Sequence, residues 1–149
     1  MTDKGQDAVN ALSMVRDAQR KIAERAKAPS YYHPALGVVF LMLCGSFEIE
    51  RGTPLITIAM CLLTILIVRY KEHTGMWLNG LTAGGRRSKG LMWMGSAVII
   101  IGLFGGLALR SIYELHGIMW AVGIVIGIFV TWLGFAWERA FLEDAGAGK

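Results

Sequence analysis

Residues 91–137 carry the feature that most constrains the fold of this chain. They form two apolar segments, 91–109 and 117–137, and neither segment contains an Asp, Glu, Lys, Arg or His. A short polar link, 110–116, joins them. In a helix, about 20 apolar residues at ~1.5 Å each match a hydrocarbon layer roughly 30 Å thick. The pair therefore predicts a transmembrane hairpin.

A second hairpin is predicted ahead of the first, with spans at about 34–48 and 53–69. Tyr31 and Tyr32 suit the headgroup zone of a bilayer, and Pro34 suits the first turn of a helix. A re-entrant pair that never crosses the bilayer is the alternative interpretation of these shorter spans. The expected fold is all-α: a four-helix membrane bundle of two hairpins, preceded by a cytoplasmic amphipathic helix.

Composition agrees with one membrane domain covering residues 31–137. Hydrophobic residues make up 54% of the 149 residues and charged residues 17%, with a mean hydropathy of +0.49. An average soluble domain has roughly 25% charged residues. Both cysteines, Cys44 and Cys61, fall in predicted spans, which indicates free thiols rather than a disulfide framework.

The N-terminal region, 1–30, contains a helical pattern over 7–28. Small and apolar residues recur every three or four positions on one face, and charged residues occupy the other; Pro29 ends the pattern. Such a helix can lie on an anionic membrane surface, pair with another helix, or remain loose. The first two alternatives make residues 7–28 a candidate contact surface.

The distribution of positive charge predicts the topology. Six Lys and Arg precede the first span, five lie between the hairpins and two in the tail 138–149, whereas each short turn has one. Positive loops stay cytoplasmic, so both termini are expected inside a bacterial plasma membrane. Glycines at 80, 84, 85 and 90 favour a loop over 69–90, and the tail is expected to fray. The residues expected to contact lipid headgroups are Arg16, Arg20, Lys21, Arg25, Lys27, Arg86, Arg87 and Lys89.

Small residues form stripes along the predicted spans. Such stripes let helix backbones approach closely, since lipid offers no hydrophobic drive for helix association. Whether the stripes meet within one chain or between chains is left open by the sequence. The predicted helix-packing residues are Gly95, Gly102, Gly106, Gly123, Gly127, Thr131 and Gly134.

No ionisable residue lies near the middle of any predicted span, which disfavours a proton-coupled exporter. A polar cluster is expected at the outer face, where it would bind a divalent metal, act in acid–base chemistry, or form ordinary ion pairs such as Glu48–Arg110; the last is favoured. No nucleophile–His–acid pattern, metal site, cofactor or nucleic-acid partner is expected, and His33 is interpreted as a helix-entry hydrogen-bonding residue. The outer cluster comprises Glu48, Glu50, Arg51, Arg110, Glu114 and His116.

The basic helix followed by Ala28-Pro29-Ser30-Tyr31-Tyr32-His33-Pro34-Ala35-Leu36-Gly37 resembles a group of small four-span membrane proteins of high-GC Gram-positive bacteria. The likeness is specific over about residues 8–37 and general beyond them. Where that group usually has a tryptophan beside the tyrosine, this chain has Ser30 and Tyr31. The resemblance implies a plasma-membrane location and transfers no catalytic residue.

The expected function is that of a non-enzymatic accessory or scaffold protein. It would engage a partner, or its own copy, through the N-terminal helix and the small-residue faces. The alternative is a small oligomeric pore or transporter, with a path lined by Thr57, Thr64, Thr131 and Ser96. A membrane enzyme with chemistry at the outer turns has the least support.

Overall fold

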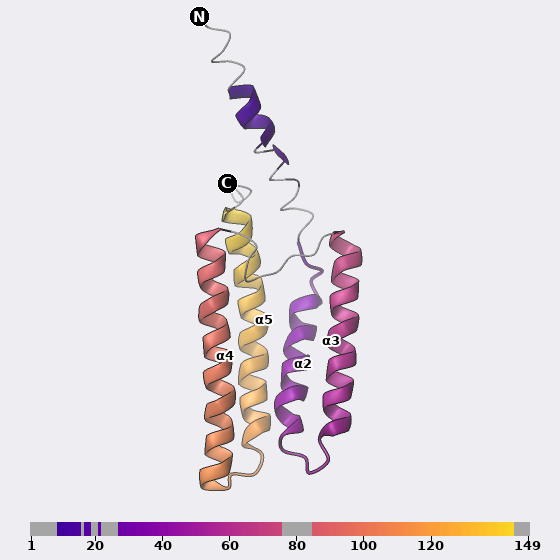
Figure 1. Cartoon of the computed structure of the whole chain (residues 1–149), viewed down its shortest axis with the longest axis vertical. Coiled ribbons are helices and arrows are strands. Elements are labelled where there is room, and N and C mark those ends of the chain that lie inside the picture. Colours follow the sequence, from indigo (N-terminus) through magenta and orange to yellow (C-terminus); the bar gives the residue numbers. More distant parts are fainter. Residues whose placement is uncertain (1–8, 16, 19–20, 22–26, 76–84, 145–149) are drawn as a thin grey trace, which may run out of the picture.

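The computed structural model describes residues 9–15, 17–18, 21, 27–75 and 85–144, and these contain helices and no strand. Four helices make up the body of the protein (Figure 1): α2 (Tyr32–Ser46), α3 (Thr53–Thr74), α4 (Arg86–Tyr113) and α5 (Ile118–Asp144). Residues 9–15 are also helical, while the rest of the predicted N-terminal helix lies largely outside the described residues.

Three of the helices, α3, α4 and α5, are long and apolar enough to cross a membrane, which indicates a membrane protein. The remaining helix, α2, has 15 residues and reaches about 22 Å at ~1.5 Å per residue. It ends at Ser46, and the chain then turns over residues 47–52. The next helix, α3, begins at Thr53 with Pro54 in its first turn. Pro34 lies in the first turn of α2, as predicted, where its missing N–H leaves no helix hydrogen bond unmade.

The helices run alternately up and down and are ordered α4, α5, α2, α3 across the molecule (Figure 1). The extensive contacts are those of α2 with α5, α4 with α5, and α2 with α3. The two outer helices, α3 and α4, do not pack closely on each other. The arrangement is therefore an open row of two hairpins, joined through the contact between α2 and α5.

Two apolar clusters hold the row together. One joins α2, α4 and α5 around Cys44, Met119, Ile126 and Val130. The other joins α2 to α3 around Val39, Ala59 and Leu66. Because α2 and α5 contribute to the larger cluster and α2 to both, these central helices carry most of the internal packing.

The prediction of a loop extending to residue 90 is wrong. The third helix continues to Thr74, where Gly75 adopts a left-handed conformation (φ 65°) and donates its backbone N–H to Lys71. The next helix already begins at Arg86, so Gly90 lies within α4, and a Cβ there would meet open space. Glycine in such a position weakens a helix without ending it, since the surrounding sequence still supplies the backbone hydrogen bonds.

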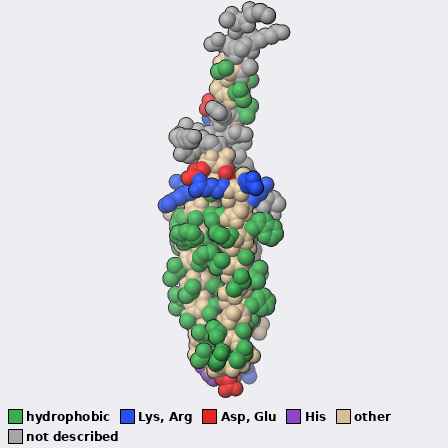
Figure 2. Space-filling view, turned by 90° about the vertical axis from the view of Figure 1, so that its left-hand side faces the viewer, with side chains coloured by type: hydrophobic (Ala, Val, Ile, Leu, Met, Phe, Trp, Pro, Cys, Tyr) green, Lys and Arg blue, Asp and Glu red, His purple; other side chains and the backbone are tan. Residues whose placement is uncertain are grey.

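The surface of the helices is apolar over most of its length (Figure 2). Large side chains such as Ile101 (71% exposed) and Ile128 (67% exposed) point outward. Lys and Arg gather in a band at the end where α3 finishes and α4 begins, and Glu and His lie at the opposite tip. In water such a surface would aggregate, whereas a lipid bilayer covers it at no cost.

Candidate functional site

A cleft of about 330 Å³ lies among the helices, in the half of the molecule where α2 begins and α5 ends. All four helices of the row contribute to its wall. Most of the wall is apolar. Its polar and aromatic side chains include Tyr32, His33, Tyr70, Trp137 and Glu138.

The polar part of the cleft is built on a buried pair from α2 and α5. Nε2 of His33 lies 3.3 Å from Oε2 of Glu138, and the side chains are 8% and 13% exposed. The two residues are 105 positions apart in the chain. They meet because the first turn of α2 packs against the last turns of α5, so the pair joins the two central helices where both leave the predicted spans.

The ring of His33 is held by its neighbours. Gly134 lies directly beneath it, and a Cβ at that position would overlap the imidazole. The ring of Phe135 makes an edge contact with a centroid separation of 4.8 Å. Thr131 donates its hydroxyl to the carbonyl of His33 at 3.3 Å and to that of Gly127 at 2.8 Å. Gly134 and Thr131, both predicted to serve helix packing, thus position the histidine.

Two residues that line the cleft each have a buried polar atom without a hydrogen-bond partner in the described part of the chain: Oε1 of Glu138 and Nε1 of Trp137. One is an acceptor and the other a donor. Buried polar groups are nearly always paired, so each such atom calls for an explanation. Nearby, the rings of Tyr32 and Tyr70 contact each other with centroids 5.0 Å apart. The residues that line the cleft therefore include a carboxylate with an unpaired oxygen, an indole with an unpaired N–H and two tyrosine rings.

Local sequence patterns place Glu138 in the tail and give His33 only a helix-entry role, so they do not predict this site. One signal was available: Glu138 follows Gly134 by four residues and therefore shares its helix face. That spacing places a carboxylate on the small-residue face of α5. The position of His33 across from it depends on how α2 and α5 pack, which no local pattern reports.

At the opposite end of the molecule, Glu48 binds the start of α5. Its carboxylate accepts the backbone N–H groups of Gly117 at 2.7 Å and Met119 at 3.3 Å. The bond from Gly117, together with that from Met119 and the charges of Arg110 and His116, lowers the pKa of Glu48 against the opposing effect of burial. Nε of Arg110 lies 3.7 Å from Oε2 of Glu48. Glu48 is thus placed as a helix cap.

The other members of the predicted outer cluster are dispersed. Glu114 and His116 line a surface depression with Arg110, on the α4–α5 turn. Arg51 and Glu114 form no ion pair in the residues that the structure describes, and Glu50 and Arg51 are exposed on the other turn. Within those same residues no three His, Cys, Asp or Glu side chains converge on a common point that would hold a metal ion.

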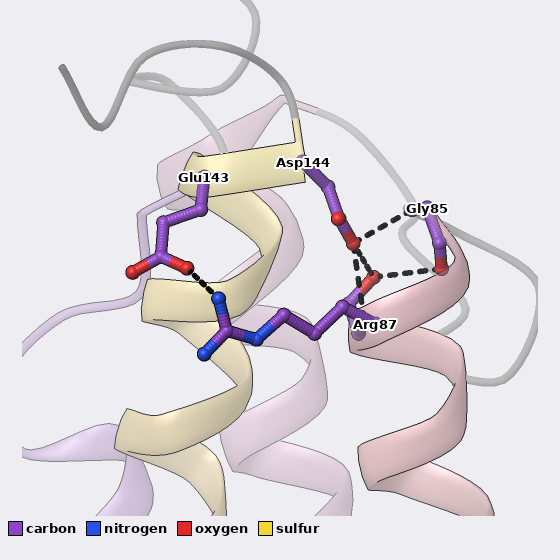
Figure 3. A network of polar contacts seen from close by, with 5 residues as sticks. Gly85, Arg87, Glu143 and Asp144 are labelled. Atoms are coloured by element: carbon purple, nitrogen blue, oxygen red, sulfur yellow. Dashed lines mark hydrogen bonds and ion pairs between the residues drawn. The ribbon is translucent and has the colours of Figure 1, made fainter.

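A second capping contact lies at the end with the positive band (Figure 3). Oδ2 of Asp144, the last residue of α5, accepts the backbone N–H of Gly85 at 3.1 Å and that of Ser88 at 3.0 Å. It also accepts the Ser88 hydroxyl at 2.8 Å. Arg87 and Glu143 form an exposed ion pair beside it at 2.5 Å. The last residue of α5 therefore accepts hydrogen bonds from backbone N–H groups at the start of α4 that have no partner within that helix.

The predicted packing glycines lie at contacts within the chain. A Cβ at Gly127 would lie 2.7 Å from the Gly37 carbonyl oxygen, and one at Gly123 would lie 3.0 Å from Cβ of Cys44. Three others on α4 face α5: Gly95 against Leu133, Gly106 against Val122, and Gly102, more loosely, against Ile126. Backbone approach at these positions lets α2, α4 and α5 pack closely.

The predicted headgroup residues are divided between described and undescribed parts of the chain. Arg86, Arg87 and Lys89 are exposed in the first turn of α4, and Lys21 and Lys27 are exposed near the N-terminus. Arg16, Arg20 and Arg25 lie outside the described residues. The apolar face of the N-terminal helix is open where it is described: Leu12 is 64% and Val15 is 55% exposed.

No protein-family model, curated protein or solved structure matches this chain. Its function is therefore argued from its own residues.

Proposed function

We propose that this chain is a four-span protein of the bacterial plasma membrane that acts as a non-enzymatic accessory protein. In this proposal both termini are cytoplasmic, and α2 crosses the bilayer as the shortest span. The positive band supports that orientation, because positive segments are retained on the cytoplasmic side. The protein would engage a partner or a second copy within the membrane.

The observation that carries the proposal is the open row. Among the described helices, α3 makes its extensive contacts with α2, and of its 22 residues only Ala59, Leu66 and Thr74 are buried. Gly123 and Gly127 of α5 already meet α2 inside the chain, so we take the exposed apolar edge of α3 as the surface for association. The exposed apolar face of the N-terminal helix adds a second surface outside the bilayer.

The pore alternative has less support. The hydroxyl of Thr57 bonds to the Thr53 carbonyl at 3.0 Å and that of Thr64 to the Met60 carbonyl at 2.9 Å, both on the exposed side of α3. Thr131 faces α2 instead. Of the four proposed lining residues only Ser96 lies at the cleft. A continuous polar path through one chain does not follow from these positions.

The chain's own cysteines provide a test. Cys61 is exposed on α3, and Cys44 is buried against α5. If a second copy binds the α3 edge, oxidative cross-linking in native membranes gives a dimer that Cys61→Ser removes and the matched variant Cys44→Ser retains. If a foreign protein binds, mild-detergent extraction followed by intact-mass measurement gives a stoichiometric complex.

Deleting residues 7–28 tests whether the N-terminal helix is needed for association. The expected result is normal membrane insertion with loss of association, because the deleted segment carries the apolar face outside the bilayer. Association that survives the deletion would show that docking through residues 7–28 is wrong. A chain that is neither cross-linked nor extracted with a partner at natural abundance would contradict the accessory function.

A further inference from the structure

The inner end of the cleft holds features that the proposed accessory function does not use. They are a buried carboxylate with one unpaired oxygen, an adjacent indole N–H without an acceptor, and two tyrosine rings. From these features we propose that the cleft binds an amphiphile with a primary ammonium group, and specifically a phospholipid with an ethanolamine headgroup. This inference goes beyond the proposed function, since a single copy of the chain suffices for it.

The ammonium group follows from Glu138. Its Oε2 faces His33 at 3.3 Å, while its Oε1 has no donor among the described residues. A buried carboxylate is stabilised by a charge-assisted hydrogen bond, and an ammonium N–H supplies both the charge and the donor. A quaternary ammonium group supplies the charge without a donor, so the unpaired oxygen favours ethanolamine over choline.

The aromatic rings add to the same preference for a cation. Tyr32, Tyr70 and Trp137 all line the cleft beside Glu138. The negative faces of such rings attract cations, and more strongly where water is excluded. A carboxylate with neighbouring aromatic faces is thus a site for an organic cation rather than for an anion.

The phospholipid part follows from Trp137 and from the position of the cleft. Its Nε1–H is buried without an acceptor, and a phosphate or ester oxygen next to the ammonium group would accept it. The cleft is walled by apolar residues of all four helices, including Leu36, Phe40 and Ile99. Phe40 and Ile99 lie within spans of the proposed topology, so this part of the wall lies at the depth of the bilayer. An acyl chain can therefore lie along its wall.

The test measures lipid binding to the full-length protein in mild detergent by native mass spectrometry. The two probes are phosphatidylethanolamine and phosphatidylcholine with identical acyl chains. The unsubstituted protein is expected to bind the ethanolamine lipid about tenfold more tightly, the size of one charge-assisted hydrogen bond. Equal binding of the two lipids would overturn the proposal without any variant.

Variants on α5 identify the group responsible. Glu138→Gln is expected to reduce the preference to about twofold or less, because the charge is lost. The matched control Glu143→Gln, which changes an exposed carboxylate at the same helix end, is expected to retain it. Should Glu138→Gln fail to fold, Trp137→Phe keeps the ring and removes the N–H. It is expected to weaken both phospholipids alike and leave the preference unchanged; loss of the preference alone would contradict the assigned contact.

A primary ammonium group could come from a phospholipid headgroup or from a free amine, and a single-chain amine distinguishes these two sources. Dodecylamine carries the ammonium group and a hydrocarbon chain without a phosphate. Its displacement of the ethanolamine lipid supports one shared ammonium site. Binding of dodecylamine together with failure of the phospholipid to bind would assign the cleft to a free amine and overturn the phospholipid assignment. These outcomes are independent of Cys61 cross-linking, so failure of the accessory function and failure of the lipid site are distinguishable.

Discussion

Asp144, the last residue of α5, binds the first turn of α4 through Ser88. The Asp144 carboxylate accepts both the backbone N–H and the hydroxyl of Ser88, at 3.0 and 2.8 Å (Figure 3). The pKa of Asp144 is lowered by these two bonds from Ser88, by the bond from the Gly85 N–H and by the charge of Arg87. A residue at the end of α5 thereby caps the start of α4 through Ser88, which lies 56 positions earlier in the chain. No capping motif within either helix provides such a contact.

Asp144→Ala is expected to destabilise the protein. Loss of a capping carboxylate costs about 1 kcal/mol, and the exposure of this site favours the lower half of the usual range. The matched variant Glu143→Ala removes only an exposed ion pair and is expected to change stability by less than about 0.5 kcal/mol. Thermal unfolding in detergent compares the two. Equal effects would mean that the cap contributes nothing beyond surface charge.

The stability of the folded protein is expected to depend on pH through Glu48. Its pKa is lower in the folded protein, because the carboxylate accepts the Gly117 N–H. Its contribution is therefore fully present above the ordinary pKa of a glutamate, about 4.3, and is lost as the pH falls through the lower folded value. On acidification from pH 6 to pH 3, the unsubstituted protein should lose more stability than Glu48→Gln does.

Glu50→Gln is the control for that experiment, since Glu50 lies in the same turn and makes no hydrogen bond in the described part of the chain. It should reproduce the acid sensitivity of the unsubstituted protein. If Glu48→Gln reproduces it as well, other carboxylates are responsible.

Gly37→Ala is expected to loosen the contact between α2 and α5. The added Cβ would lie 2.5 Å from both the Gly127 carbonyl oxygen and the Thr131 hydroxyl, so the backbones must separate. Overpacking of this kind costs about 1–3 kcal/mol. Gly105→Ala is the control on α4: nothing lies within 4 Å, and the variant should be neutral or gain up to about 1 kcal/mol of helix propensity. Unfolding by denaturing detergent measures both.

Glu114→Gly is expected to stabilise the turn between α4 and α5. Glu114 has φ 50° and ψ 32°, a left-handed conformation that costs a residue with a Cβ about 1 kcal/mol or more. The opposite change, Gly117→Ala at φ 84°, should destabilise the same turn. A loss of stability in Glu114→Gly would show that its carboxylate makes a contribution larger than the strain.

The topology is testable with reporters fused after the described helices. Fusions at the C-terminus and between α3 and α4 should report a cytoplasmic location, and fusions in the two short turns the opposite side. Neutralising Arg86, Arg87 and Lys89 together should weaken the orientation, because these residues supply most of the positive charge between the hairpins. An external C-terminus would contradict the four-span arrangement.

Local patterns in the sequence were sufficient to predict the class of protein and most of its helices. Two charge-free segments imply apolar helices because every charge would have to be desolvated, and that argument needs no tertiary information. Pro34 and Pro54 likewise indicate helix starts through their own backbone chemistry. The extension of α4 back to Arg86 was not predictable in this way, because its cap comes from Asp144.

The tertiary structure alone decided which side chains meet. The stripes of small residues indicated close packing, but only the helix order showed that Gly37 meets Gly127 within one chain. The same order brings His33 and Glu138 together and leaves α3 and α4 apart, which creates the cleft. A periodic pattern specifies the face of a helix and leaves its neighbour and its rotation unspecified. Those depend on the packing of all four helices at once, so the site appears only in the assembled fold.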